Sequence, residues 1–438
     1  MYSVEWSKLF SRSRRAGAAP DALAEGEVAA EDRVTRRGRL LPAVSRTVWA
    51  LGLTSLLTDI SSEMVASILP AYLVLYLGMT PLAFGVVDGL YQGAAALVRV
   101  VAGVVADRWH RHKQVAAFGY GLSAVCRLLI LAAGNAWGMI ATIITLDRIG
   151  KGIRTAPRDA LISQRSPATQ LATAFGVHRA MDAIGAMLGP VLAFALLALM
   201  PGGFDVLFVA SFGIAIVGLG AIILFVPSVV PGEQEITPTR ASFRTAVQML
   251  GEARFRGLVV TGVLLGLATV SDNFIFLILQ RRMDVGLTAF PLFYVGTSLV
   301  TSAFAIPCGR LADRVGRKRV LLGGYGILAM VYVILLLPAV GGFSLLAAAV
   351  FLLGVFYAAT DGVLTAMAAA ALPTSHLGSG LAVFATATNL ARLAASVIYG
   401  FLWSRAGIGQ ATGWYLLALA ASVVGASLVL NRPKQHVI

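Results

Sequence analysis

The sequence predicts an all-α polytopic membrane protein whose twelve transmembrane helices form two pseudo-symmetric six-helix bundles. Three observations support this fold class. The 438 residues are 58% hydrophobic and 13% charged, with a mean hydropathy of +0.81, which is more apolar surface than a soluble core absorbs. The apolar runs reach the roughly 20 residues that a membrane helix needs, since lipid offers the backbone no hydrogen-bond partner. Finally, one short charged sequence occurs twice.

The repeated sequence joins the second apolar run of each half to the third. It reads Gly-Val-Val-Ala-Asp-Arg-Trp-His-Arg-His-Lys at 103–113 and Gly-Arg-Leu-Ala-Asp-Arg-Val-Gly-Arg-Lys-Arg at 309–319. A single copy in a soluble protein would be an ordinary solvated turn. Two copies between membrane-length runs indicate two similar halves, each with a charged hinge. The hinge residues that we expect to act in gating are Gly103, Asp107, Arg111, Gly309, Asp313 and Arg317.

The remaining elements follow in order along the chain. Residues 1–46 contain nine Lys or Arg and no apolar run long enough for a signal peptide, so we expect a cytoplasmic tail. A first bundle at 47–226, a cytoplasmic loop at 227–256, a second bundle at 257–431 and a cytoplasmic C-terminus at 432–438 follow. The expected spans are 47–77, 82–106, 114–134, 137–156, 171–199, 204–226, 257–280, 287–311, 319–339, 343–371, 378–403 and 411–431.

The distribution of charge predicts the orientation in the membrane. Lys and Arg gather in the tail, in both hinges and at 151–165 and 240–256, whereas connections such as 78–81 and 134–137 contain none. This positive-inside pattern places both termini in the cytoplasm. The net charge of +14 is thereby explained without nucleic acid. Cys126 and Cys308 both fall within apolar segments, so no disulfide or metal cluster is expected.

Both hinges resemble the loop signature Gly-x-Leu-Ala-Asp-Arg-x-Gly-Arg-Lys of the major facilitator superfamily of secondary transporters. The second copy follows it closely, and the first has His110 where a glycine is usual. The chain is similar to a bacterial branch of this superfamily, with 58–64 and 147–159 as its own signatures. The resemblance implies the fold of that superfamily, a multi-pass protein of the bacterial inner (plasma) membrane, and secondary transport.

Two further motifs carry the resemblance. Arg148 and Gly152 match the pattern Arg-x-x-Gln-Gly, whose arginine is implicated in proton transfer in many members, although Lys151 replaces the glutamine. The helix-packing residues Gly185, Gly189 and Pro190 resemble the Gly-x-x-x-Gly-Pro part of the fifth-helix signature of proton-coupled exporters. The glycine pair that closes that signature is absent, since Ala193 and Phe194 stand there.

Ionisable side chains within the spans are the candidate functional residues, because each is costly in lipid unless it faces a polar interior. In the first span Asp59 and Glu63 lie four apart and share a helical face with several hydroxyls. One interpretation makes these acids permanent partners of Arg99 or Arg127; the other makes them a cavity wall. Helices one and four line the cavity in the superfamily, so the acids and Arg148 are expected to meet there.

The other candidates are distributed over both halves. In the fourth span Arg154 and Arg158 lie toward the cytoplasmic end and are expected to anchor it at the membrane surface. The expected proton-coupling residues are Asp59, Glu63, Arg148, His178 and Asp182. The expected residues of the substrate cavity are Asp88, Gln92, Arg127, Asp272, Asn273, Asp361, Asn389 and Arg392.

These observations favour a secondary active transporter that works by alternating access and is coupled to protons, with a preference for export of a small organic solute. A sodium-coupled or facilitative importer, for example of metal chelates or siderophores, is the alternative. An intramembrane enzyme or lipid-handling protein is less favoured, because no His-Glu-x-x-His or Gly-x-Ser-x-Gly string occurs. We therefore expect a monomer in the lipid bilayer with no enzyme activity, cofactor, bound metal or nucleic-acid partner.

Overall fold

The computed structural model describes residues 44–109, 111–167, 170–227, 249–283, 285–337, 342–373 and 377–431. All regular elements in these ranges are helices. The first half contains α2 (Arg46–Ala71), which continues as the π-helix η2 (Tyr72–Tyr76), then α3 (Pro81–Trp109), α4 (His112–Ala132), α5 (Trp137–Gln164), α6 (Leu171–Leu199) and α7 (Phe204–Phe225). The tail and the loop from 228 to 248 lie outside the described residues.

The second half contains two short 3₁₀ helices, η4 (Met249–Gly251) and η5 (Leu287–Ala289), and six longer α-helices. These are α9 (Ala253–Leu267), α10 (Asp272–Met283), α11 (Pro291–Val315), α12 (Arg317–Leu336), α13 (Gly342–Ala369) and α14 (Leu377–Leu430). In the described residues, 8 helices are long and apolar enough to cross a membrane. The all-α membrane fold is confirmed, and the number of twelve crossings stays a prediction.

Two breaks in the helices of the second half have local causes. The predicted ranges 378–403 and 411–431 both lie in α14, which consists of two helices that meet at a kink, where Gly407 has a positive φ of 81° between the two ranges. The range 257–280 is broken between Leu267 and Asp272 into α9 and α10. The Tyr332 hydroxyl donates to Ala268 O at 3.0 Å and accepts from Val270 N at 2.7 Å, which satisfies backbone groups that the break frees.

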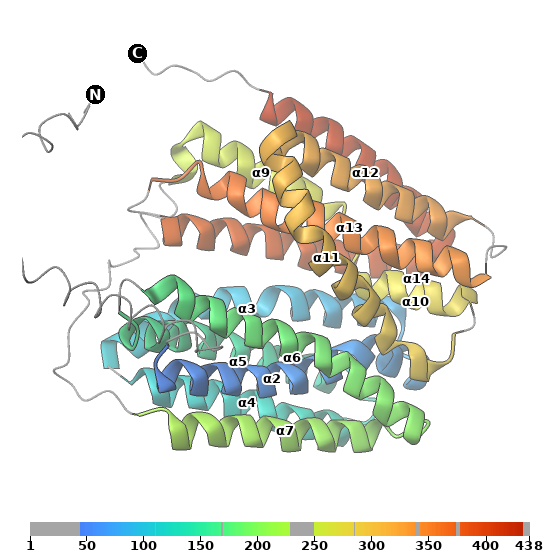
Figure 1. Cartoon of the computed structure of the whole chain (residues 1–438). Helices are drawn as coiled ribbons and strands as arrows, with labels where there is room; N and C mark the ends of the chain where they lie inside the picture. Colours follow the sequence, from blue (N-terminus) through green and yellow to red (C-terminus); the bar gives the residue numbers. More distant parts are fainter. Residues whose placement is uncertain are drawn as a thin grey trace, which may run out of the picture. The chain divides into compact units, whose positions relative to one another are not determined.

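The helices pack in the same pairs in both halves (Figure 1). The first helix packs on the fifth, which gives α2 with α6 and α9 with the first part of α14. The second packs on the fourth, which gives α3 with α5 and α11 with α13. All described residues from Ser45 onward belong to one compact unit, in which α3 contacts α14 and α6 contacts α11 across the two halves.

The contact between α3 and α14 is a seam of close backbone approach. A Cβ added at Gly400 would lie 2.4 Å from Pro81 O, and one at Gly85 would lie 2.6 Å from Ser396 O. Beside this seam Phe84, Phe274 and Tyr399 stack edge to face, with centroids 4.9–5.0 Å apart. The halves are therefore in tight contact at the end of the bundle where α3 begins.

The contact between α2 and α6 is equally close. A Cβ on Gly185 would lie 2.6 Å from Leu56 O, and one on Gly189 would lie 2.8 Å from the Cβ of Glu63. Pro190 follows within α6. Glycine at these positions lets the two backbones meet. The face of α2 that carries Glu63 is consequently held against α6.

Candidate functional site

Arg127 of α4 is the centre of a buried network. Its Nε donates to Ser61 Oγ and one Nη donates to Ser62 Oγ, both at 2.8 Å, while the other Nη pairs with Asp147 of α5 at 2.9 Å. Only 3% of its side chain is exposed. A buried charge with partners on every nitrogen is a structural tie between three helices. This arginine is therefore a partner of α2 hydroxyls and of Asp147, and its place in a substrate cavity stays a prediction.

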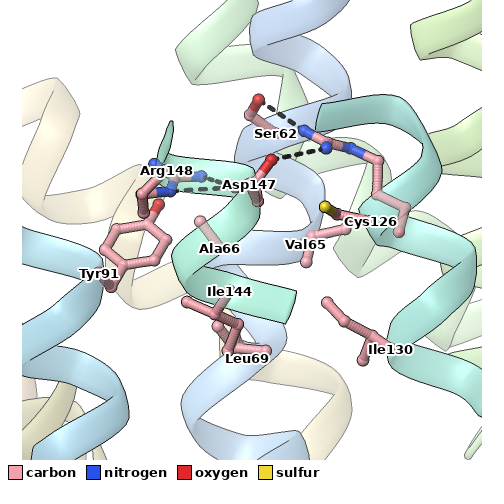
Figure 2. A pocket seen from close by; sticks show the side chains of 11 residues that line it. Ser62, Val65, Ala66, Leu69, Tyr91, Cys126, Ile130, Ile144, Asp147 and Arg148 are labelled. Carbon is pink, nitrogen blue, oxygen red and sulfur yellow. Dashed lines mark hydrogen bonds and ion pairs between the residues drawn. The ribbon is translucent and has the colours of Figure 1, made fainter. Parts of the chain in front are cut away.

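Arg148 pairs with its own neighbour in the chain. Its Nε donates to Asp147 at 3.0 Å, a second nitrogen also reaches Asp147, and the guanidinium carbon lies 3.9 Å from the centre of the Tyr91 ring (Figure 2). In this structure Arg148 forms no ion pair with Asp59 or Glu63, although it lies within electrostatic range of Glu63. The Asp147 carboxylate binds Arg127 and Arg148 together, so Arg148 is already paired in this conformation.

The cavity that these side chains surround is small. Figure 2 shows Tyr91, Asp147 and Arg148 on one side of it and Val65, Leu69 and Ile130 on the other. Its volume of about 20 Å³ suffices for about one water molecule. The network can therefore hold a water or relay a proton, but no organic solute fits there.

The acids of α2 face a different part of α5. Asp59 forms a loose ion pair of 3.7 Å with Arg154, and within the described residues Glu63 makes neither a hydrogen bond nor an ion pair. Lys151 is the basic group with the strongest electrostatic effect on Glu63. The burial of Arg154, which is 3% exposed, contradicts its expected anchoring at the membrane surface.

His178 and Asp182 of α6 form a second polar cluster. His178 Nδ1 lies 3.4 Å from Asp182, and its Nε2 shares a hydrogen bond of 2.9 Å with Ser55 of α2. Arg158 joins the cluster, with 3.1 Å to Ser55 and 3.9 Å to Asp182. The structure thus brings His178 and Asp182 together, at a point on α2 two turns before Glu63.

Asp88 lies between the halves. Its carboxylate accepts a hydrogen bond of 2.6 Å from Ser396 of α14 and another from the side chain of Asn273 on α10, which in turn accepts from Tyr294 of α11. Asp88 is 2% exposed. In this conformation the predicted cavity residues Asp88 and Asn273 are bound to each other across the seam, and their contact with substrate stays a prediction.

The second half contributes a pair of charged side chains that water reaches. Arg392 of α14 lies 3.5 Å from Asp361 of α13, with 37% and 57% of their side chains exposed. Nearby, Tyr357 donates a hydrogen bond to Asp272 at the start of α10. Charged groups exposed within membrane-length helices are expected to face an aqueous space, because lipid would be far less favourable.

The remaining predicted residues make fewer described contacts. Gln92 and Asn389 are half-buried. In the second hinge Gly316 has a φ of 106° where α11 passes into α12, and Asp313 lies 3.4 Å from Arg317 with both side chains well exposed. Arg111 is exposed as well, and Gly309 is half-buried. The side chains of Gly103 and Asp107, and residue His110, lie outside the described residues.

Several residues of these clusters do not stand out in the sequence. Asp147 is visible there as an acid beside Arg148, but its two arginine partners come from different helices. Tyr91, Tyr294 and Ser396 give no signal, since an aromatic or a serine in a membrane helix is usually a packing residue. Lys151 stands out only as a departure from a motif, and in the structure it lies within electrostatic range of Glu63.

Comparisons with known proteins agree with this fold. A model of the Major Facilitator Superfamily matches residues 51–299 and 273–437. An uncharacterized MFS-type transporter of Methanocaldococcus jannaschii is 30% identical over 371 residues, which cover 82% of this chain and 89% of that protein.

Solved structures resemble the chain at low sequence identity. The nucleoside transporter NupG superposes with a TM-score of 0.74 at 14% identity, covering 88% of this chain and 98% of that one. A POT family transporter, solved with a thioalcohol-conjugated peptide, gives 0.71 at 12% identity over 88% of this chain and 95% of its own. With the family match over both halves, these likenesses lead to one conclusion: the chain belongs to the major facilitator superfamily and is a multi-pass membrane transporter.

Proposed function

We propose that this transporter couples the movement of a small organic solute to protons, with Glu63 as the proton carrier and export as the preferred direction. The observation that supports it is the placement of Glu63. It lies near the middle of the combined α2–η2 segment, and no described residue gives its carboxylate a hydrogen bond or ion pair. A carboxylate without a fixed partner can take up and release a proton as its surroundings change.

The groups around Glu63 define what those changes are. The charged neighbours are Asp59 on α2 with Asp147, Arg148 and Lys151 on α5; Tyr91 of α3 and Tyr294 of α11 also lie within electrostatic range, and α6 meets it through Gly189. Movement of Lys151 toward Glu63 favours the charged carboxylate, and movement away favours the protonated one. Alternation would move protons if the two states differ in this distance.

Uptake and exchange assays separate coupling from binding. Inside-out vesicles with an imposed pH gradient are first screened with a library of small organic compounds to find one that accumulates. For that compound, Glu63→Gln should abolish gradient-driven uptake and keep gradient-independent exchange, with Asp59→Asn as the second candidate. The exposed Glu252→Gln at the start of α9 is the matched control and should retain both. Accumulation by both variants in response to pH would refute the assignment, and a response to a sodium gradient alone would favour the sodium-coupled alternative.

We further propose that both termini lie in the cytoplasm of a bacterial cell. Support comes from the positive charge of the tail and hinges, against the uncharged turns at 78–81 and 134–137. In that orientation the seam between α3 and α14 is at the outer surface, so this conformation is closed to the outside. Reporter fusions within 134–137 should report an outer location, and fusions within 228–248 a cytoplasmic one.

A further inference from the structure

Two basic side chains in the middle of α5 have nitrogens without a close partner among the described residues. Lys151 lies at the midpoint of α5, and its ammonium makes no hydrogen bond or ion pair with any described residue. Arg154 is buried and its guanidinium carbon lies 4.7 Å from the centre of the Tyr120 ring, but its Nη1 has no hydrogen-bond partner among the described residues and its ion pair with Asp59 is as long as 3.7 Å. Unpaired donors at this depth are costly, which identifies them as candidates for function.

The two other arginines of this buried network have more partners among the described residues. Arg127 and Arg148 of the same bundle share Asp147 as their acid, and they add serine hydroxyls and the Tyr91 ring. Lys151 and Arg154 lie three apart on α5, on adjacent turns of one face. That face is turned to α2, since Arg154 reaches Asp59 and Lys151 acts on Glu63.

The balance of charge on this face changes with one proton. With Glu63 charged, two acids oppose two bases. When Glu63 carries a proton, as the proposed function requires, the face has one positive charge in excess. An anion is then attracted to the Lys151 ammonium and to Nη1 of Arg154. The planar guanidinium of an arginine can bind two oxygens of a carboxylate or phosphate group.

We propose that Lys151 and Arg154 bind an anionic group of the transported solute, which is therefore a carboxylate, sulfonate or phosphate compound. This inference rests on the proposed function for the timing of binding but not for the site itself. When Glu63 takes up a proton, it no longer balances the charge of Lys151, and the anionic group of the solute becomes the electrostatic partner of Lys151.

The test measures binding at constant pH to the purified full-length chain in phosphatidylcholine nanodiscs, by the shift of the thermal unfolding midpoint. The probes are matched pairs of acids and neutral analogues: benzoate and benzamide, nicotinate and nicotinamide, glucose 6-phosphate and glucose. Acids should stabilise the wild type more than their neutral partners. Lys151→Gln and Arg154→Gln should weaken that binding at least tenfold, Lys151→Arg should retain it within about threefold, and Glu63→Gln should strengthen it.

The matched control is Arg405→Gln, which removes an exposed positive charge from α14 at a distance from this face and should leave acid binding unchanged. Equal binding of acids and neutral analogues, acid binding that survives in Lys151→Gln, or no response to any acid would overturn the proposal. A further measurement uses nanodiscs that also contain phosphatidylglycerol. If Lys151 responds to that lipid and not to the soluble acids, the anion is a lipid headgroup and the assignment to a solute is wrong.

The two proposals fail in different ways. Because this assay uses no gradient, selective acid binding combined with coupled uptake by Glu63→Gln would refute the proton carrier and leave the anion site standing. Coupled uptake that needs Glu63, combined with no preference for acids, would refute the anion site alone.

Discussion

Asp88 and Ser396, 308 positions apart in the sequence, form a hydrogen bond of 2.6 Å that joins α3 of the first half to α14 of the second. Asn273 donates to the other oxygen of the same carboxylate. A hydrogen bond to a charged group contributes about 1.5–3 kcal/mol. This bond is therefore one of the contacts that should set how long the two halves stay closed at the end where α3 begins.

Ser396→Ala should favour separation of the halves at this seam. Loss of one charge-assisted bond is expected to shift the equilibrium between the closed and open states by roughly tenfold or more. Spin labels at Leu82 and Phe401, both exposed, in a background without Cys126 and Cys308 would report the change as longer distances. Ser404→Ala is the control, because Ser404 bonds only Gly400 O of its own helix, and an equal effect there would contradict the role of Asp88.

Gly400→Ala should lower the thermal stability of the closed seam. The new Cβ would lie 2.4 Å from Pro81 O, a backbone atom that cannot rotate away, and overpacking of this kind costs about 1–3 kcal/mol. Gly413→Ala, with no neighbouring atom within 4 Å, is the matched control on α14. The thermal unfolding midpoint should decrease for Gly400→Ala only. Equal midpoints for the two variants would mean that the helices can move apart at Gly400 without a loss of stability.

Tyr332→Phe should destabilise the break between α9 and α10. The Tyr332 hydroxyl serves Val270 N and Ala268 O, both buried, and an orphaned buried group costs about 1–3 kcal/mol. Tyr76→Phe, at a tyrosine that is 56% exposed, controls for the loss of a hydroxyl. Thermal unfolding measures the loss of stability relative to the wild type. Faster hydrogen exchange confined to residues 268–271 would show that this loss arises at the break.

Asp107→Asn and Asp313→Asn should slow transport and leave solute affinity largely unchanged, because the hinges are expected to act in the conformational step. The exposed pair of Asp313 and Arg317 at 3.4 Å contributes little to stability, so the unfolding midpoint of Asp313→Asn should stay near that of the wild type. Exchange rates and binding constants measured on the same preparation separate the two effects. Weakened binding with normal exchange would show that the hinges belong to the solute site.

The fold could be predicted because the membrane imposes simple rules on the sequence. Length and hydropathy locate the helices, and the duplicated hinge indicates the two halves. The break before Asp272 could not be predicted, because the residue that stabilises it, Tyr332, lies on another helix. The same holds for the site. Asp59 and Glu63 stand out by their spacing, but which basic group each acid faces depends on how α5 is rotated, because Arg148 and Arg154, six positions apart, project from different sides of that helix.

The glycine seam between α3 and α14 has a consequence for the speed of the cycle. When two leucine-lined surfaces meet, each side chain loses about 0.5–1 kcal/mol of rotamer entropy, and that loss recurs at every closure. Gly85 and Gly400 have no rotamers to lose, so backbone can meet backbone without a search among side-chain conformations. Under alternating access this surface can close and reopen with little entropic resistance, which leaves the timing of turnover to polar contacts such as the bond between Asp88 and Ser396.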